Sequence, residues 1–84
     1  MYSVFYTSAA SRHLRKLPHA VRASVRDDVE ALAANPRTVQ TEKLAGAHDA
    51  YRLRVGDYRV LYTIDDRIRR VVIYRIAHRR ESYR

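Results

Sequence analysis

Residues 51–62, YRLRVGDYRVLY, decide how this chain folds. Apolar residues alternate with other types on both sides of Gly56-Asp57, and this dipeptide favours a two-residue hairpin loop because glycine supplies the positive φ. Such a loop predicts three cross-strand pairs: Val55 with Tyr58, Arg54 with Arg59, and Leu53 with Val60. The segment is therefore expected to form an antiparallel β-hairpin.

The two faces of this hairpin differ in character. The face expected to cover helices carries Tyr51, Leu53, Val55, Tyr58, Val60, Tyr62 and Ile64. The other face carries Arg52, Arg54 and Arg59, together with Leu61 and Thr63. Like charges directly opposite one another destabilise a sheet by about 0.2–1 kcal/mol, so folding does not require this arrangement. We interpret the three arginines as an anion site; the alternative is that they extend into water or pair with Asp49, Asp57 or Asp65.

The sequence before the hairpin predicts one strand and two helices. Residues 2–7, YSVFYT, are β-branched and aromatic and are expected to form the strand. Ser8 is expected to cap the first helix, Pro18 to lie in the first turn of the second, and Asn35-Pro36 to end it. One apolar stripe runs through both helices and is interpreted as core: Ala10, Leu14, Leu17, Val21, Val25, Val29 and Leu32.

The order of the expected elements predicts an α+β fold. Residues 36–50 are expected to be irregular, and three strands are expected at about 51–55, 58–65 and 70–77. The last strand is apolar on both faces, which indicates an interior position in the sheet. Residues 1–84 should form a single βααβββ domain, in which a helical hairpin packs on one face of a mostly antiparallel four-stranded sheet.

The charge of the chain indicates a polyanionic partner. The chain contains seventeen Lys and Arg residues, of which fifteen are Arg, and nine Asp and Glu residues, for a net charge of +8. Residues 51–84 carry ten arginines and four acids, a net charge of +6, whereas residues 1–50 carry only +2. A basic excess concentrated in one part of a domain is typical of proteins that bind nucleic acid.

Several classes of protein and site are not supported by the sequence. There is no apolar run long enough to span a membrane and no signal-peptide pattern, so we expect a cytoplasmic protein. The chain has no cysteine, which excludes disulfides and thiolate metal sites. Its first three histidines lack metal-ligand spacing, and two glycines do not make a phosphate-binding loop. We therefore expect neither a metal nor a cofactor.

The last seven residues, HRRESYR, extend the basic region beyond the final strand. They carry His78, Arg79, Arg80 and Tyr83. Histidine is the side chain suited to proton transfer near neutral pH, and tyrosine can donate a proton or stack on a nucleobase. The alternative is a solvated tail with the tyrosine ring packed over it.

Three segments resemble the RelE branch of the RelE/ParE toxin superfamily: KLAG at 43–46, YRLRVGDYRVLYTIDD at 51–66 and IAHRRESYR at 76–84. With the βααβββ order, the resemblance covers essentially the whole chain. It implies a toxin of a bacterial or archaeal toxin–antitoxin pair. Such toxins are endoribonucleases that enter the ribosomal A site and cut messenger RNA there, without a metal, by attack of the ribose 2′-OH on the adjacent phosphate.

The resemblance also assigns roles to residues of this chain. Arg52 and Arg54 match the two basic residues before the hairpin turn, and Arg59 matches the arginine after it. Arg79 matches the arginine that follows the last strand, and Tyr83 matches the closing tyrosine. The arginines are expected to position the scissile phosphate and stabilise its transition state, while Tyr83 stacks on a base or takes part in proton transfer.

This chain departs from the family pattern where some members carry lysine in place of Arg52 and Arg54. Lysine can lose its proton and act as a base, whereas arginine stays protonated. We therefore expect His78 to be the general base; alternatively, the ribosome's alignment of the RNA does most of the work. Outside the catalytic set, Lys43 and Arg80 are expected to bind RNA.

The resemblance implies three partners: a RelB-like antitoxin that is acidic and partly disordered, the ribosome with its messenger RNA, and operator DNA bound only through the antitoxin. No membrane partner is expected. Three alternatives remain: a ParE-like inhibitor of gyrase, a nucleic-acid-binding module without catalysis, and a degenerate toxin that binds only antitoxin and operator. Arg54, Arg59, Arg79 and Tyr83 argue against the first, because ParE-type toxins generally lack that set.

Overall fold

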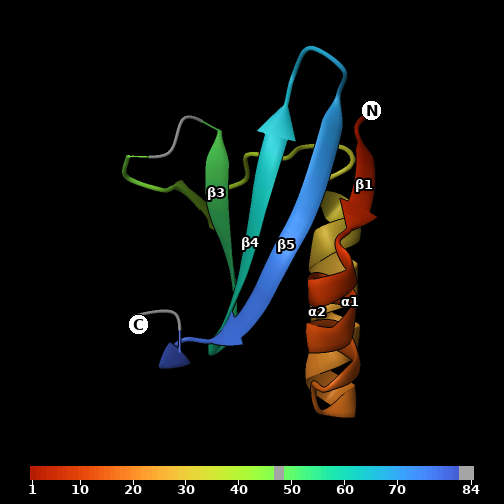
Figure 1. Cartoon of the computed structure of the whole chain (residues 1–84), viewed down its shortest axis with the longest axis vertical. Coiled ribbons are helices and arrows are strands. Elements are labelled where there is room, and N and C mark those ends of the chain that lie inside the picture. The colour runs from red at the N-terminus through yellow and green to blue at the C-terminus, as the bar shows by residue number, and fades with distance from the viewer. Residues whose placement is uncertain (47–48, 82–84) are drawn as a thin grey trace.

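The computed structural model describes residues 1–46 and 49–81 (Figure 1). In chain order the elements are β1 (Ser3–Tyr6), α1 (Ser8–Arg15), α2 (His19–Ala31), β2 (Thr41–Lys43), β3 (Ala50–Val55), β4 (Tyr58–Asp65) and β5 (Arg70–His78). This is the expected α+β order with one additional strand, β2, inside the segment that was expected to be irregular. No helix in the described ranges is long and apolar enough to cross a membrane.

The strands form one sheet in the order β1-β5-β4-β3-β2. Only the pairing of β1 with β5 is parallel; the other neighbours run antiparallel. The expectation of four strands was wrong by one, because β2 is three polar residues, TEK, whose extended state comes from pairing with β3. β5 lies between β1 and β4, which confirms its interior position (Figure 1).

The hairpin between β3 and β4 has the expected register. Val55 pairs with Tyr58, Arg54 with Arg59, and Leu53 with Val60. Gly56 has a φ of +58°, the left-handed conformation that this loop needs and that glycine adopts without a steric penalty. The two-residue loop therefore determines which side chains of β3 and β4 share a face.

Both helices begin one residue away from the expected position. Thr7, not Ser8, caps α1: its backbone is extended, and its Oγ1 accepts a hydrogen bond from the backbone N–H of Ala10 at 3.1 Å. Pro18 is the N-cap of α2 rather than a residue of its first turn. An N-cap residue is extended while its successor is already helical, and Thr7 and Pro18 both meet this condition.

α2 ends at Ala31, before the Asn35-Pro36 stop that the sequence suggested. The backbone N–H groups of Leu32 and Ala33 donate to carbonyls three residues back, at 3.0 and 3.1 Å. Such bonds tighten the last turn of a helix and close it. Asn35 instead caps the following turn, where its side-chain oxygen accepts from the backbone N–H of Arg37 at 3.1 Å.

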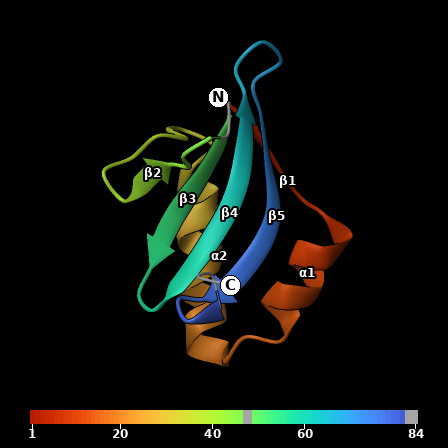
Figure 2. The same cartoon turned by 60° about the vertical axis from the view of Figure 1, so that its left-hand side comes forward.

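The core lies between the helices and one face of the sheet (Figure 2). Its largest fully buried side chain is Tyr62, whose ring stacks against Tyr51 at 5.9 Å between centroids. The Tyr62 hydroxyl donates to the carbonyl of Pro36 at 2.7 Å, which ties the segment after α2 to β4. Burial raises the pKa of Tyr62 to about 12, so the hydroxyl keeps its proton as a donor.

An exposed network joins distant segments at the end of the sheet farthest from Gly56. Arg37 donates to both carboxylate oxygens of Asp66, at 3.1 and 2.8 Å, and to the Tyr51 hydroxyl at 3.1 Å. The Tyr2 hydroxyl also donates to Asp66. The hydrogen bonds from Arg37, and then from Tyr2, lower the pKa of Asp66. The network links the residue before β1, the segment after α2, β3 and the β4–β5 connection.

We predict that Tyr62→Phe lowers the free energy of unfolding by about 1–3 kcal/mol, because the Pro36 carbonyl loses its donor inside the core. Urea unfolding followed by circular dichroism measures the change. Tyr74→Phe is the matched control, since Tyr74 is only partly buried and its hydroxyl makes no hydrogen bond within the described residues. An equal loss in both variants would contradict the role of the Tyr62 hydroxyl.

The pKa of Asp66 is lower in the folded protein than in the unfolded chain, so the ionised carboxylate stabilises the fold. This stabilisation is fully present above the unfolded-state pKa of about 4. It is lost as the pH falls through the lower pKa of the folded state. We predict that Asp66→Asn and Arg37→Gln both flatten the acid side of the stability profile. Urea midpoints measured from neutral to strongly acidic pH test this. A profile as steep as that of the wild type in both variants would refute it.

Candidate nucleic-acid interface

Arg54 and Arg59 lie directly opposite each other on β3 and β4. Side chains of such a pair share a face, with Cβ atoms about 5 Å apart. Their neighbours Val55 and Val60 are buried against the helices, so the two arginines belong to the opposite, open face of the sheet. The structure therefore brings together two like charges that were expected to converge.

Arg59 is the only charged side chain of the described residues that is buried, with 8% of its surface exposed. One terminal nitrogen donates to the carbonyl of Tyr58 at 3.3 Å, and the buried Nε has no hydrogen-bond partner. No carboxylate pairs with Arg59 in the described parts of the chain. A buried guanidinium with an unmet donor destabilises the folded state, and an anion is a ligand that could satisfy it.

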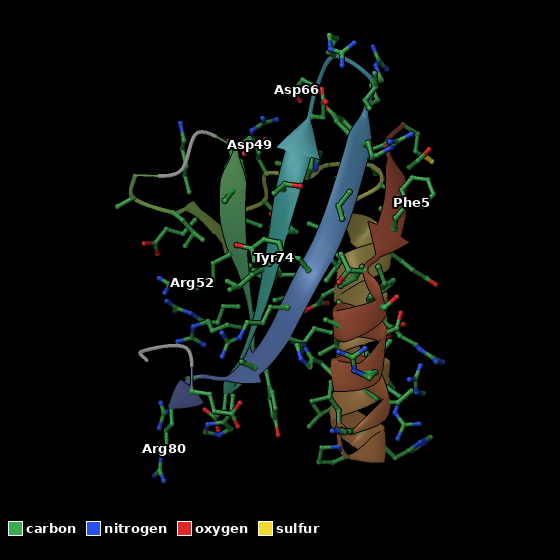
Figure 3. The ribbon with its side chains drawn as sticks, in the orientation of Figure 1. Phe5, Asp49, Arg52, Asp66, Tyr74 and Arg80 are labelled. Atoms are coloured by element: carbon green, nitrogen blue, oxygen red, sulfur yellow. The ribbon has the colours of Figure 1, made fainter. Side chains whose placement is uncertain are left out.

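Arg52 lies on the same face, two residues before Arg54, and makes a salt bridge with Glu42 at 3.1 Å. The two residues are register partners on β3 and β2. Figure 3 shows the Arg52 side chain directed away from the helices. Sequence reasoning missed Glu42 because β2 was not predicted, and without β2 nothing placed an acid beside Arg52.

Arg79 is held at the hairpin turn by Asp57. Its backbone N–H donates to the Asp57 carbonyl at 2.7 Å, and its guanidinium lies 3.8 Å from the Asp57 carboxylate. Ala77, two residues earlier, is the register partner of Arg59. The chain after β5 thus returns toward the arginine pair, as expected. Arg80 is exposed beyond the end of β5 (Figure 3).

His78 is not brought to the arginine face. It is the register partner of Tyr58, its ring meets the Tyr58 ring edge-on at 5.2 Å, and Tyr58 packs against the core. The reason is a register shift at Leu61/Tyr62, which leaves Tyr74 as an extra residue on β5 and reverses the alternation that follows. His78 instead lines a cleft of about 240 Å³ on the helix side, together with His13 and Lys16.

Lys43 also lies away from the arginines. Its register partner is Tyr51, which packs against the core, so the Lys43 side chain belongs to the other face of β2. Tyr83 lies outside the described residues. Of the expected site residues, the structure therefore brings Arg52, Arg54 and Arg59 to one face with Arg79 at its end.

A family model described as the ParE toxin of the type II toxin–antitoxin system parDE matches residues 4–83. The chain belongs to this family. Toxin RelE of Mycobacterium tuberculosis is 41% identical to it, over 99% of this chain and 87% of that protein. This is a RelE-type toxin of a type II toxin–antitoxin system, which confirms the resemblance seen in the sequence.

Solved structures of RelE-type toxins share the fold. In the RelBE2 toxin–antitoxin complex of Mycobacterium tuberculosis, one chain superposes with a TM-score of 0.81 at 35% identity, covering 92% of this chain and 96% of that one. In the archaeal RelE–RelB complex of Pyrococcus horikoshii, the TM-score is 0.83 at 28% identity, with 93% and 94% covered. The arrangement of sheet and helices in this toxin is thus that of RelE toxins.

We predict that Arg54→Gln stabilises the folded toxin by about 0.2–1 kcal/mol, because it removes one of two like charges placed directly opposite each other. The gain should shrink in high salt, which screens the repulsion in the wild type. Thermal and urea unfolding at two salt concentrations provide the measurement. If Arg54→Gln were less stable than the wild type at low salt, the two arginines would not be repelling each other.

Proposed function

We propose that this toxin is a ribosome-dependent endoribonuclease that cleaves messenger RNA in the A site and so inhibits translation. The observation that carries the proposal is Arg59, a buried guanidinium without a carboxylate partner in the described structure, set opposite Arg54. Such an arrangement costs stability, and a bound phosphate would offset that cost. The family membership supplies the biological setting of a toxin.

In the proposed reaction the ribose 2′-OH attacks the adjacent phosphate and leaves a 2′,3′-cyclic phosphate and a 5′-hydroxyl. The non-bridging oxygens of the phosphoryl group gain negative charge in the pentacoordinate transition state. Guanidinium groups already fixed by the sheet can stabilise that charge without reorganising, which is the main source of catalysis at such sites. No metal or cofactor is needed, because the arginines supply the positive charge.

Each arginine has a distinct place in this proposal. Arg59 and Arg54 bind the scissile phosphate from the sheet face, and Arg79, oriented by Asp57, approaches it from the end of the hairpin. Arg52 binds the RNA backbone next to them. Tyr83 is proposed to stack on a base or to take part in proton transfer.

The remaining basic residues have outer roles. Arg80, exposed past β5, and Lys43, on the edge strand β2, are proposed to contact RNA phosphates away from the reaction. Such contacts add affinity that weakens as salt rises. His78 does not act on a phosphate bound between Arg54 and Arg59, since it belongs to the opposite face of the sheet.

We propose a RelB-like antitoxin as the protein partner, and operator DNA as a partner only through that antitoxin. Solved relatives form RelE–RelB complexes, which supports the proposal. A chain with net charge +8 and an open basic face is suited to an acidic, partly disordered segment that folds as it binds. Since ribosomes are the proposed target, the toxin would act in the cytoplasm.

The ParE name of the family model favours one rival function, inhibition of DNA gyrase without cleavage of RNA. A further rival is a toxin homologue that binds nucleic acid but has lost catalysis. Translation in vitro with added toxin separates the nuclease from both rivals. A nuclease shortens the messenger, a gyrase inhibitor leaves both messenger and protein synthesis intact, and a non-catalytic binder leaves the messenger intact at any toxin concentration.

We predict that Arg59→Ala lowers the rate of messenger cleavage on translating ribosomes by about 10²–10³-fold, as expected when one fixed donor is removed from a transition state. Arg67→Ala is the matched control, because Arg67 is exposed at the far end of the sheet. Primer extension on the messenger measures both rates. Full cleavage by Arg59→Ala would refute a catalytic role for the arginine pair.

A further inference from the structure

Cleavage by the 2′-OH requires a group that removes the hydroxyl proton, and the arginine face does not provide one among its arginines. Arginine side chains are poor proton acceptors, because the guanidinium group holds its proton throughout the physiological range. His78 belongs to the other face of the sheet. A carboxylate on the open face, close to the place where the arginines hold the phosphate, can accept that proton.

Glu42 is a carboxylate on that face. It is the register partner of Arg52, and both side chains lie on the side of the sheet that carries Arg54. The salt bridge joins Glu42 Oε2 to Arg52 at 3.1 Å and leaves Oε1 as a second acceptor. The Glu42 side chain is 64% exposed, so a bound RNA can reach it.

Glu42 also borders a place for the attacking nucleotide. A hollow of about 300 Å³ at the β2–β3 edge is lined by Val39, Gln40, Thr41, Glu42, Arg54 and Gly56. Its volume is at the lower end of the range for small-molecule sites. Arg54 and Glu42 thus border the same hollow. We place a nucleotide there with its phosphate at Arg54 and its 2′-OH, which is adjacent to that phosphate, toward Glu42.

We propose that Glu42 is the general base of this toxin, taking the 2′-OH proton of a nucleotide held in the β2–β3 hollow; this rests on the proposed endoribonuclease function. The proton passes to the Glu42 carboxylate while the 2′-oxygen forms its bond to phosphorus. The bond between phosphorus and the 5′-oxygen breaks, and that oxygen leaves with the electron pair and takes a proton from water. Glu42 then returns its proton to solvent.

Arg52 and Arg54, both on β3, are the charged groups that face Glu42 from the one strand paired with β2. Arg52 fixes the direction of the carboxylate, which a general base needs because proton transfer depends on geometry first. Asp57 is a competing carboxylate, next in sequence to Gly56 of the hollow. It lies in the hairpin turn, is engaged with Arg79, and does not line the hollow.

The test is single-turnover cleavage of messenger on ribosomes with an empty A site, with toxin in excess. Glu42→Gln is expected to lower the rate by about 10²–10⁴-fold, the usual contribution of a general base. Glu42→Asp should retain part of the activity, and Asp27→Asn, the same type of change on the exposed surface of α2, should cleave as the wild type does. Circular dichroism melting checks that each variant is folded.

Two further measurements separate a base from a residue that only orients Arg52. The wild-type rate should fall as the pH enters the range in which carboxylates take up protons, and Glu42→Gln should lose that dependence while Asp57→Asn keeps it. In an Arg52→Gln background, Glu42→Gln should still cause a large further loss. If the double variant is no slower than Arg52→Gln alone, Glu42 acts only through Arg52 and the proposal is wrong.

A substrate with sulfur in place of the leaving 5′-oxygen shows which proton transfer is affected. Sulfur leaves without a proton, so a defect in protonating the leaving group disappears, whereas a missing base remains a defect. The Glu42→Gln loss is expected to persist, and its disappearance would overturn the assignment. If the wild type cleaves messenger and Glu42→Gln cleaves it at the same rate, the proposed role of Glu42 is wrong but the endoribonuclease function stands. If the wild type leaves messenger intact, the proposed endoribonuclease function is wrong.

Discussion

The two-residue turn at Gly56-Asp57 fixes the register in which β3 pairs with β4. In this register Arg54 lies opposite Arg59 on the open face of the sheet. Alternation along the same strands sends Leu53, Val55 and Val60 into the core. The packing of the helices therefore fixes the two strands that carry these arginines. A one-residue slip would bury the arginines under the helices, so the core and the site impose the same register.

Charge on the open face is balanced unevenly, and the imbalance explains the chemistry proposed for it. Arg52 has a carboxylate partner in Glu42, and Arg79 has one in Asp57. Arg59 is buried without such a partner in the described structure. In the proposed function, the carboxylates orient Arg52 and Arg79 toward the RNA, and an RNA phosphate offsets the electrostatic cost of burying Arg59.

Much of the fold was predictable because the apolar pattern changes from a helical period before residue 36 to a period of two after residue 50. The register of the hairpin could be predicted from its turn, and so could the face on which the arginines lie. The position of His78 could not be predicted. It depends on the extra residue at Tyr74, and no local signal in an apolar strand marks a bulge. The place of Glu42 was not predicted for a related reason. β2 is extended because it pairs with β3, and its three polar residues carry no sequence signal for a strand.

The central claim is that the arginine face holds one RNA phosphodiester on the ribosome while the 2′-OH attacks it. The most direct measurement is sequencing of messenger 5′ ends, with their end chemistry, after the toxin is added to a purified translation system with and without ribosomes. The account predicts new 5′-hydroxyl ends within A-site codons, matched by 2′,3′-cyclic phosphates, and only when ribosomes are present. Intact messenger, ends bearing a 5′-phosphate, or equal cleavage of free RNA would contradict it.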